Sequence, residues 1–325
     1  MKCFFSVVFA IFVILASQSG CARRPEGWRG PDQLAKAEAV PWVTREAPAS
    51  ILKSQHYWVY TTLPEGRQRD ALPQVLEGAY EQYQALAPAE PIDPRPMPAY
   101  VFAHREEWAE FTTRKTGNDA PMYRRITRGG YTIDDWFVAY ALDEQATLSV
   151  ASHEGWHQYA ARHFRNRLPP FLEEGIACLF ETVRMQGALP RWNISVNPAR
   201  AYALSKAARA GQLWPLDELV TMHAGEVVDL PAAKVDAFYA QNWAFARFLL
   251  EGDGGRYRPK LQRWLADTAA GTVYDPGGTL RTPGKAWDPS GTRAVLEHYL
   301  GQDFASIERA YAAYVAQLTD SFPSR

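Results

Sequence analysis

Two histidines four residues apart constrain this chain more than any other feature of its sequence. Residues 153–157 are His-Glu-Gly-Trp-His, an H-E-x-x-H pattern. Side chains at positions i and i+4 of an α-helix lie on one face, so His153 and His157 would project side by side. Two neutral imidazoles at that spacing can bind one Zn²⁺, with Glu154 placed to act on a water molecule. The segment 146–164 contains no proline, which favours a helix here.

A catalytic zinc site takes three protein ligands and leaves one position open. Glu174 could complete the set from a second helix that begins near Pro170, and Glu173 is the competing ligand. Adjacent prolines at 169 and 170 end the first helix and start the second, so the two helices can pack side by side. The alternative for Glu174 is an exposed acid in a first turn, where the helix dipole favours it.

The remaining sequence divides near residue 142. Apolar and polar residues alternate in strand-like runs at 56–63, 97–103 and within 129–142, around helical patterns at 67–86 and 105–113. After residue 142 the expected helices are 143–164, 172–185, 198–211, 234–251, 257–269, 290–300 and 303–319. Strands followed by helices predict an α+β fold: a mixed or antiparallel sheet lobe, 51–142, and a helical lobe, 143–319.

The residues beyond the H-E-x-x-H pattern resemble a known family. HEGWHQY at 153–159, followed by P-x-x-L-x-E-G-x-A-x-x-x-E at 169–181, is similar to the gluzincin zinc metallopeptidases. The resemblance extends to the peptidase MA-like domain of uncharacterised bacterial lipoproteins and covers about residues 143–318. It implies a zincin-like fold, Glu174 as the third ligand, one Zn²⁺ per chain, and a peptide or protein substrate. Asn242 and Phe171 depart from the usual Ser and Trp, and neither is a ligand.

A mechanism follows from this set of residues. Zinc held by His153, His157 and Glu174 would polarise a water molecule and lower its pKa towards neutrality. Glu154 would take the proton and deliver it to the leaving amine. An edge strand within 129–142 could hold an extended peptide by strand addition.

Several further residues are candidates with an alternative beside each. Glu181, two turns after Glu174, would hydrogen-bond a ligand imidazole, or else face solvent. Tyr239, near the start of the 234–251 helix, would donate a hydrogen bond to the developing oxyanion, or else pack in the core with its hydroxyl on a backbone carbonyl. Cys178 is expected to be a small packing residue, and His163 and His223 to be surface or packing residues.

The first 20 residues are predicted to be a secretory signal peptide, with a basic start, an apolar run at 3–16 and small polar residues after it. Ser19-Gly20-Cys21 resembles a bacterial lipobox, although Gln18 stands where an aliphatic residue is usual. This predicts an exported protein of the cell envelope or periplasm, attached to a membrane by lipid on Cys21. A plain secretory signal or an uncleaved anchor is the alternative. Residues 21–50, rich in Pro, Gly, Arg and Ala, are predicted to be a flexible tether.

Charge narrows the range of partners. Lys and Arg number 35 against 36 Asp and Glu, a net charge of -1, which gives no basis for nucleic-acid binding.

Two alternatives to a metallopeptidase stay open: a non-catalytic envelope lipoprotein that retains the fold, and a zinc hydrolase of a non-peptide substrate. The presence of Glu154 argues against the first, because a binding module has no use for a general base.

Overall fold

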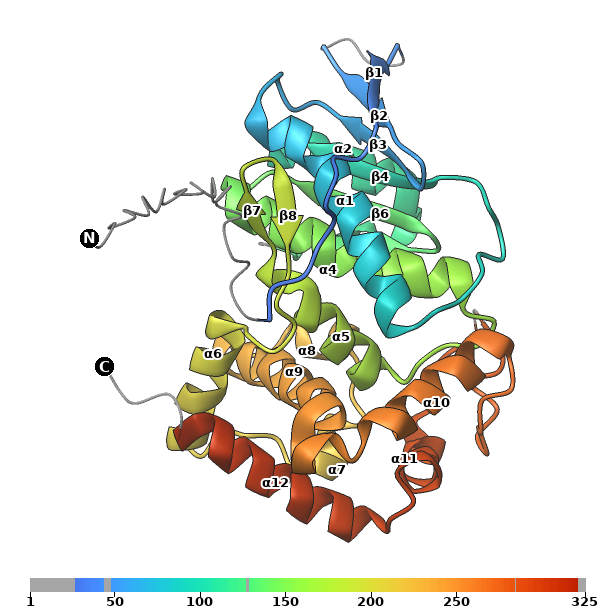
Figure 1. Ribbon diagram of the computed structural model, residues 1–325, viewed down its shortest axis with the longest axis vertical. Helices are drawn as coiled ribbons and strands as arrows, with labels where there is room; N and C mark the ends of the chain where they lie inside the picture. The colour runs from blue at the N-terminus through green and yellow to red at the C-terminus, as the bar shows by residue number, and fades with distance from the viewer. Residues whose placement is uncertain (1–26, 44–47, 127–128, 284, 321–325) are drawn as a thin grey trace, which may run out of the picture.

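Six strands form a mixed sheet in the order β1-β2-β3-β4-β6-β5 (Figure 1). The three central strands β3, β4 and β6 run parallel, whereas β1, β2 and β5 pair antiparallel with their neighbours. The β5 strand therefore lies at one edge of the sheet. The strand bounds are β1 Glu38–Pro41, β2 Ser50–Lys53, β3 Tyr57–Thr61, β4 Met97–Phe102, β5 Gly130–Ile133 and β6 Trp136–Tyr140.

This structure is a computed structural model, and it describes residues 27–43, 48–126, 129–283 and 285–320. The predicted signal peptide, residues 1–20, and the predicted lipid acceptor Cys21 lie outside the described residues. Among the described helices, none combines the length and apolarity that a membrane span requires.

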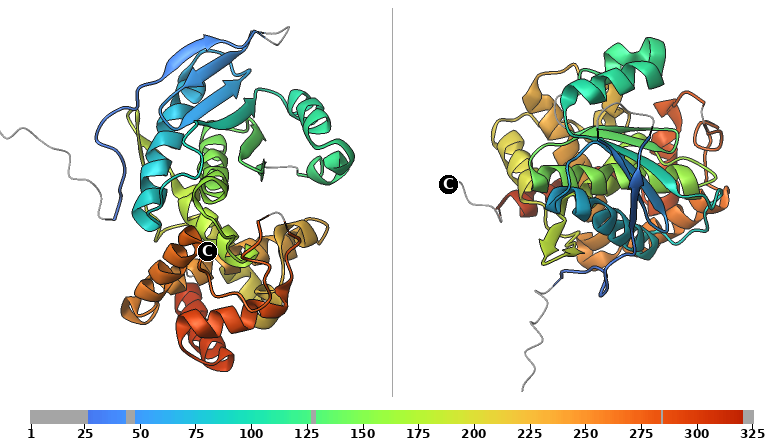
Figure 2. Two further views of the ribbon diagram at one scale, coloured as in Figure 1. Left: turned by 90° about the vertical axis from the view of Figure 1, so that its right-hand side faces the viewer. Right: turned by 90° about the horizontal axis from the view of Figure 1, so that it is seen from above.

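Alternating side chains give the sheet two apolar faces. In β4, Ala99 and Val101 belong to the main core, while Tyr100 and Phe102 belong to a smaller cluster on the other face. This alternation follows from the two-residue period of a strand. Helices α1 (Arg67–Leu86) and α4 (Glu144–His163) pack on the main-core face, and α2 (Arg105–Thr116) packs on the other (Figure 2). The short elements η1 (Gly117–Asp119) and α3 (Ala120–Tyr123) follow α2.

The helical lobe is built around α9 (Ala232–Gly255), which packs against α5, α6, α10 and α12. Its side chains Trp243, Phe245, Phe248 and Leu249 are fully or almost fully buried, so α9 is a core helix. The other helices are α5 Pro170–Leu179, α6 Pro198–Arg209, α7 Leu216–Leu219, α8 Ala224–Val227, α10 Arg258–Ala270, η3 Pro289–Gly291, α11 Thr292–Leu300 and α12 Phe304–Asp320.

The predicted α+β class, with a small mixed sheet and a helical lobe, is confirmed, and most predicted helices match to within a few residues. Although α4 comes after residue 142 in the chain, it packs in space against α1 and the sheet. Helix α5 contacts the opposite side of α4 (Figure 2). The two lobes therefore meet along the α4–α5 contact, and one core cluster runs through both.

Two predicted segments differ from the structure. The tether prediction for 21–50 is wrong at residues 38–41, which form β1, and Ala35 is held on α1 because its N–H and C=O both bond to the Gln74 amide (2.8 and 3.0 Å). The helix predicted for 172–185 ends at Leu179 and continues as a 3₁₀ turn, η2 (Phe180–Thr182). A hairpin of β7 (Arg184–Gln186) and β8 (Leu189–Arg191) follows, because Gly187 adopts φ 62° and turns the chain back.

Candidate metal centre

Helix α4 brings the H-E-x-x-H residues onto one face, as the spacing predicts. Asp143 directly precedes the helix, and its side chain accepts a hydrogen bond from the Ala146 N–H (2.8 Å) and so caps the first turn. The His153 and His157 Nε2 atoms lie 3.4 Å apart. Both rings are largely buried, so these nitrogens are held by the surrounding protein.

Glu174 on α5 lies opposite the two imidazoles. Its Oε2 atom is 3.4 Å from His153 Nε2 and 3.7 Å from His157 Nε2. Ligand bonds of about 2.0–2.2 Å at tetrahedral angles place the donor atoms of a zinc site about 3.4 Å apart. The three atoms therefore form a triangle of the size that one tetrahedral Zn²⁺ requires.

Two glycines allow the surrounding helices to approach this closely. A Cβ at Gly175, next to Glu174, would lie 2.3 Å from the backbone oxygen of Asn242, so α5 meets α9 there backbone to backbone. A Cβ at Gly155 would lie 2.8 Å from the Tyr83 hydroxyl, which donates to the Ser152 carbonyl. The Gly155 position thus admits a side chain from α1.

The buried charges of this cluster depend on one another. Glu174 Oε2 is buried and accepts no hydrogen bond among the described residues. Burial by itself would raise the pKa of Glu174, but the charges of His157 and His153 hold that pKa well below its usual value. Burial lowers the pKa of His157, but Glu174 and Glu173 outweigh it and raise the pKa to about 10. A divalent cation among the three groups would supply the positive charge that the imidazoles otherwise carry as protons.

The outer nitrogen of each imidazole also meets a carboxylate. Glu181 Oε1 lies 3.1 Å from His153 Nδ1, and Glu173 Oε1 lies 3.1 Å from His157 Nδ1. Carboxylates in these positions fix the ring orientation and the tautomer of metal-binding histidines. Glu173, considered above as a competing ligand, therefore lies on the Nδ1 side of His157, away from the triangle. Glu181 lies in the η2 turn after α5.

Glu154 points towards the edge strand of the sheet. The residue is 8% exposed, and its carboxylate accepts a hydrogen bond from the Thr132 hydroxyl of β5 at Oε2 (2.9 Å). The same hydroxyl lies 3.2 Å from the Glu154 backbone oxygen. Thr132, which sequence reasoning missed, thus fixes the side chain of the candidate general base.

Tyr239 approaches the cluster from α9. Burial and then the charge of Glu174 raise the pKa of its phenol above the ordinary value, so the ring lies within electrostatic range of the triangle. Within the part of the chain that the structure describes, its hydroxyl makes no hydrogen bond, and the alternative of a bond to a backbone carbonyl is not found. The phenol O–H is therefore available to donate a hydrogen bond.

The other singled-out residues take simpler places. Cys178 is fully buried, with Sγ within 4.8 Å of ligand atoms of His153 and Glu181. His163 is buried, with Nε2 2.9 Å from the Tyr80 hydroxyl and Nδ1 2.9 Å from the Tyr159 carbonyl, which confirms it as a packing residue. His223 is a half-exposed residue at the start of α8 and lies outside the triangle.

Two more residues that sequence reasoning missed hold Glu181 from the start of α6. Asn197 Nδ2 donates to Glu181 Oε2 (2.8 Å), and the Arg200 guanidinium bonds to both carboxylate oxygens. Asn197 was detectable as a helix cap, because Asn followed by Pro is typical of a helix start. Its hydrogen bond to Glu181 was not detectable from the sequence, because the two residues belong to different elements.

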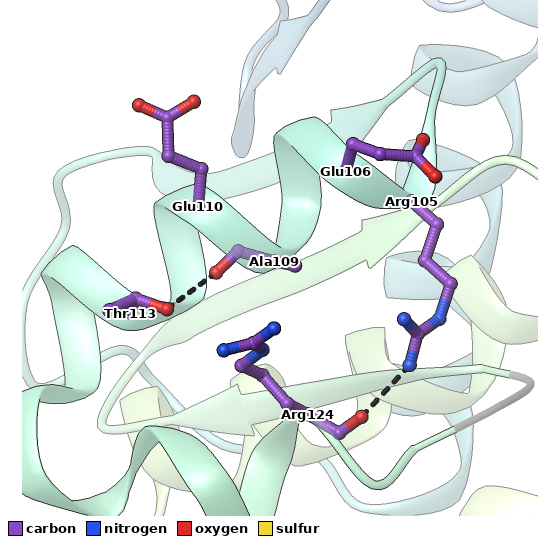
Figure 3. Close-up of a pocket in the computed structure, with 6 residues that line it drawn as sticks. All are labelled: Arg105, Glu106, Ala109, Glu110, Thr113 and Arg124. Carbon is purple, nitrogen blue, oxygen red and sulfur yellow. Dashed lines mark hydrogen bonds between the residues drawn. The ribbon is translucent and has the colours of Figure 1, made fainter.

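A separate hollow lies on the outer side of the sheet lobe, along α2 (Figure 3). Arg105 Nη2 donates to the Arg124 carbonyl there (2.9 Å), and Thr113 donates to the Ala109 carbonyl (2.8 Å). Two arginines line it together with Glu106 and Glu110, so the hollow favours neither an anionic nor a cationic ligand.

Comparison with known proteins leaves the site to be judged on its geometry, because no family model, curated protein or solved structure matches this chain.

Proposed function

We propose that this chain is a zinc-dependent metallopeptidase of gluzincin type, with a zincin-like fold. The observation that carries the proposal is the triangle of two imidazole nitrogens and one carboxylate oxygen, with sides of 3.4, 3.4 and 3.7 Å. The buried Glu174 Oε2 accepts no hydrogen bond within the described structure and faces the two imidazoles at 3.4 and 3.7 Å, which supports a cation between the three groups, because a buried carboxylate is costly unless a positive charge pairs with it.

His153, His157 and Glu174 would hold one Zn²⁺ per chain. Bound there, zinc would act as a Lewis acid on the scissile carbonyl and would lower the pKa of water. Glu154 accepts the proton of the attacking water and returns it to the leaving nitrogen. The Thr132 hydrogen bond occupies Oε2 of Glu154, which leaves Oε1 to carry that proton.

The Tyr239 hydroxyl has the role of donor to the oxyanion as it forms. Donors preorganised towards developing charge contribute strongly to catalysis, because they do not need to reorient during the reaction. Tyr239 belongs to α9, a different element from those that carry the triangle, so it can face the cluster from another side.

A peptide substrate fits the sheet edge beside Glu154. Among the described strands, β5 pairs with β6 alone, so its other edge has backbone groups to offer an extended chain. Thr132 belongs to this strand and contacts Glu154, which places the edge next to the candidate general base. This favours a peptide over a non-peptide substrate. A non-catalytic role would leave Glu154 and its fixed orientation without a use.

Export and a lipid on Cys21 belong to the same proposal and rest on the sequence of residues 1–21. A peptidase attached in this way would act on peptides or proteins of the cell envelope.

Metal content and hydrolysis together test the proposal. The purified protein should contain about one zinc per chain and cleave members of a peptide library. His157→Ala should lose most of the zinc. Glu154→Gln should retain zinc and lose cleavage, because an amide cannot accept the proton. Full zinc in His157→Ala would exclude the site, and an active Glu154→Gln would exclude the mechanism.

A further inference from the structure

Arg200 lies between Glu181 and Tyr239, two residues next to the candidate centre. It is the third residue of α6, and its guanidinium meets Glu181 through two hydrogen bonds, Nη2 to Oε1 (2.6 Å) and Nε to Oε2 (2.9 Å). The same Oε1 atom is the one that lies 3.1 Å from His153 Nδ1. A side chain on α6 is therefore linked to a candidate zinc ligand on α4 through one carboxylate.

The guanidinium also meets Tyr239. Its Cζ atom lies 5.0 Å from the centre of the tyrosine ring, within the range of a cation–π contact. Helix α6 packs against α9, which brings the two side chains together. One planar group thus contacts both the carboxylate behind His153 and the candidate oxyanion donor.

We propose that Arg200 is a positioning residue that holds Glu181 against His153 and Tyr239 beside the cluster at the same time. The inference rests on the proposed function and extends it to a residue outside the H-E-x-x-H and Glu174 motifs. Arginine suits this role because its rigid fork binds a carboxylate through two bonds and its flat face packs on an aromatic ring. A lysine offers the charge without either geometry.

Glu181 depends on Arg200 for its fixed orientation. The carboxylate is 15% exposed and receives three donated hydrogen bonds, two from Arg200 and one from Asn197. Without Arg200, the donors left to it are Asn197 and His153, so the carboxylate could rotate away from the imidazole. Outer partners of metal-binding histidines typically change metal affinity by about 10–100-fold, and Arg200 acts one bond further out, which places its effect at about tenfold.

The chain offers a matched control in Arg247. This side chain pairs with Glu251 on α9, and its Cζ lies 5.1 Å from the ring of Trp243. Arg247 thus combines an ion pair with an aromatic contact, as Arg200 does, but among the described residues no hydrogen bond or ion pair joins it to the cluster. A purely structural role for Arg200 would make the two arginines equivalent.

Zinc affinity, measured by competition with a chromophoric chelator, tests the link to His153. We expect Arg200→Ala and Arg200→Lys each to bind zinc about tenfold more weakly, and Arg247→Ala to bind it as the wild type does. Glu181→Gln with Arg200→Ala should be no weaker than Glu181→Gln alone, because both changes act through one carboxylate. Unchanged affinity in Arg200→Ala, full rescue by lysine, or an equal loss in Arg247→Ala would overturn the inference.

A second measurement on the metal-free protein tests the link to Tyr239. Fluorotyrosine incorporation gives a ¹⁹F signal for Tyr239, assigned by its loss in Tyr239→Phe. Arg200→Ala should shift this signal and Arg247→Ala should leave it in place, and a signal unmoved by Arg200→Ala would overturn the inference. If the wild type binds no zinc, the proposed function fails while the fluorine signal still decides whether Arg200 positions Tyr239.

Discussion

At the scale of single residues, the candidate centre consists of charges that each have an assigned neighbour. His153 meets Glu181, His157 meets Glu173, and Glu154 accepts from Thr132. Such contacts hold side chains in one rotamer before any substrate arrives, which is the condition for positioned acid–base chemistry. The contribution of Thr132 can be measured by removing its single hydroxyl.

Thr132→Val should slow hydrolysis without removing zinc. Valine keeps the shape and the strand preference of threonine but cannot donate to Glu154. A hydrogen bond to a charged group contributes about 1.5 kcal/mol or more, so kcat/KM should fall about tenfold. Thr132→Ser, which keeps the hydroxyl, should retain most of the activity. Equal rates in the valine and serine variants would show that the hydrogen bond does not position Glu154.

Tyr239→Phe should lower kcat by about 10²–10³, the usual effect of losing one oxyanion donor. The exchange removes one hydroxyl that makes no hydrogen bond within the described structure, so the melting temperature and zinc content should stay unchanged. Tyr202→Phe on α6 is the control, because Tyr202 is 65% exposed. An unaltered kcat in Tyr239→Phe would remove Tyr239 from the mechanism.

At the scale of secondary-structure elements, the spacing of helices decides where Glu174 lies. The helix α5 carries Glu174 and Gly175 in succession, and at Gly175 the backbone of α5 lies close to the backbone of α9. The carboxylate therefore reaches the imidazoles of α4 only while α5 stays in contact with α9. A bulkier residue at position 175 would separate the two helices.

Gly175→Ala should destabilise the protein and weaken zinc binding together. Alanine favours a helix over glycine by about 1 kcal/mol, but a Cβ at 2.3 Å from the Asn242 backbone oxygen forces α5 outwards. Overpacking of this kind costs about 3 kcal/mol, which leaves a net loss of about 2 kcal/mol in the free energy of unfolding. Urea unfolding of the metal-free protein measures this loss.

The control for this exchange is Gly277→Ala, where a Cβ would meet its nearest neighbour at an ordinary 3.7 Å. That variant should keep both stability and zinc affinity. A Gly175→Ala protein as stable as the wild type would show that α5 and α9 can separate at no cost.

At the scale of the whole molecule, the candidate centre lies where the two lobes meet. The candidate ligands His153 and His157 belong to α4, which packs on the sheet, whereas the candidate ligand Glu174 belongs to α5, which packs on α9 (Figure 1). A continuous core joins the lobes, so the meeting of α4 and α5 rests on side-chain packing.

The attachment of the whole molecule is predicted to depend on Cys21. Cys21→Ser should abolish labelling by a radioactive fatty acid and move the protein from the membrane to the soluble fraction, or leave it unprocessed. The reason is that the thiol of Cys21 is the proposed acceptor of the lipid. Labelling and fractionation that stay the same in the serine variant would place the attachment elsewhere.

The sequence by itself determined the parts of this protein that depend on neighbours along the chain. The i, i+4 spacing predicted the shared face of His153 and His157, and apolar periodicity predicted helices such as 67–86, which matches α1 at both ends. The same local patterns predicted the order of strands before helices. Periodicity is set by side chains a few residues apart, so it can be detected without the fold.

Only the tertiary structure decided which groups face one another. Thr132 meets Glu154, Arg200 meets both Glu181 and Tyr239, and Gly175 meets Asn242, in each case across different elements. The sequence predicted Glu174 as the third ligand with the adjacent Glu173 as its competitor, and the placement of α5 against α9 and α4 puts Glu174 in the triangle and Glu173 at His157 Nδ1. Such assignments depend on how packed helices are spaced and rotated, and no periodicity within a single helix contains that information.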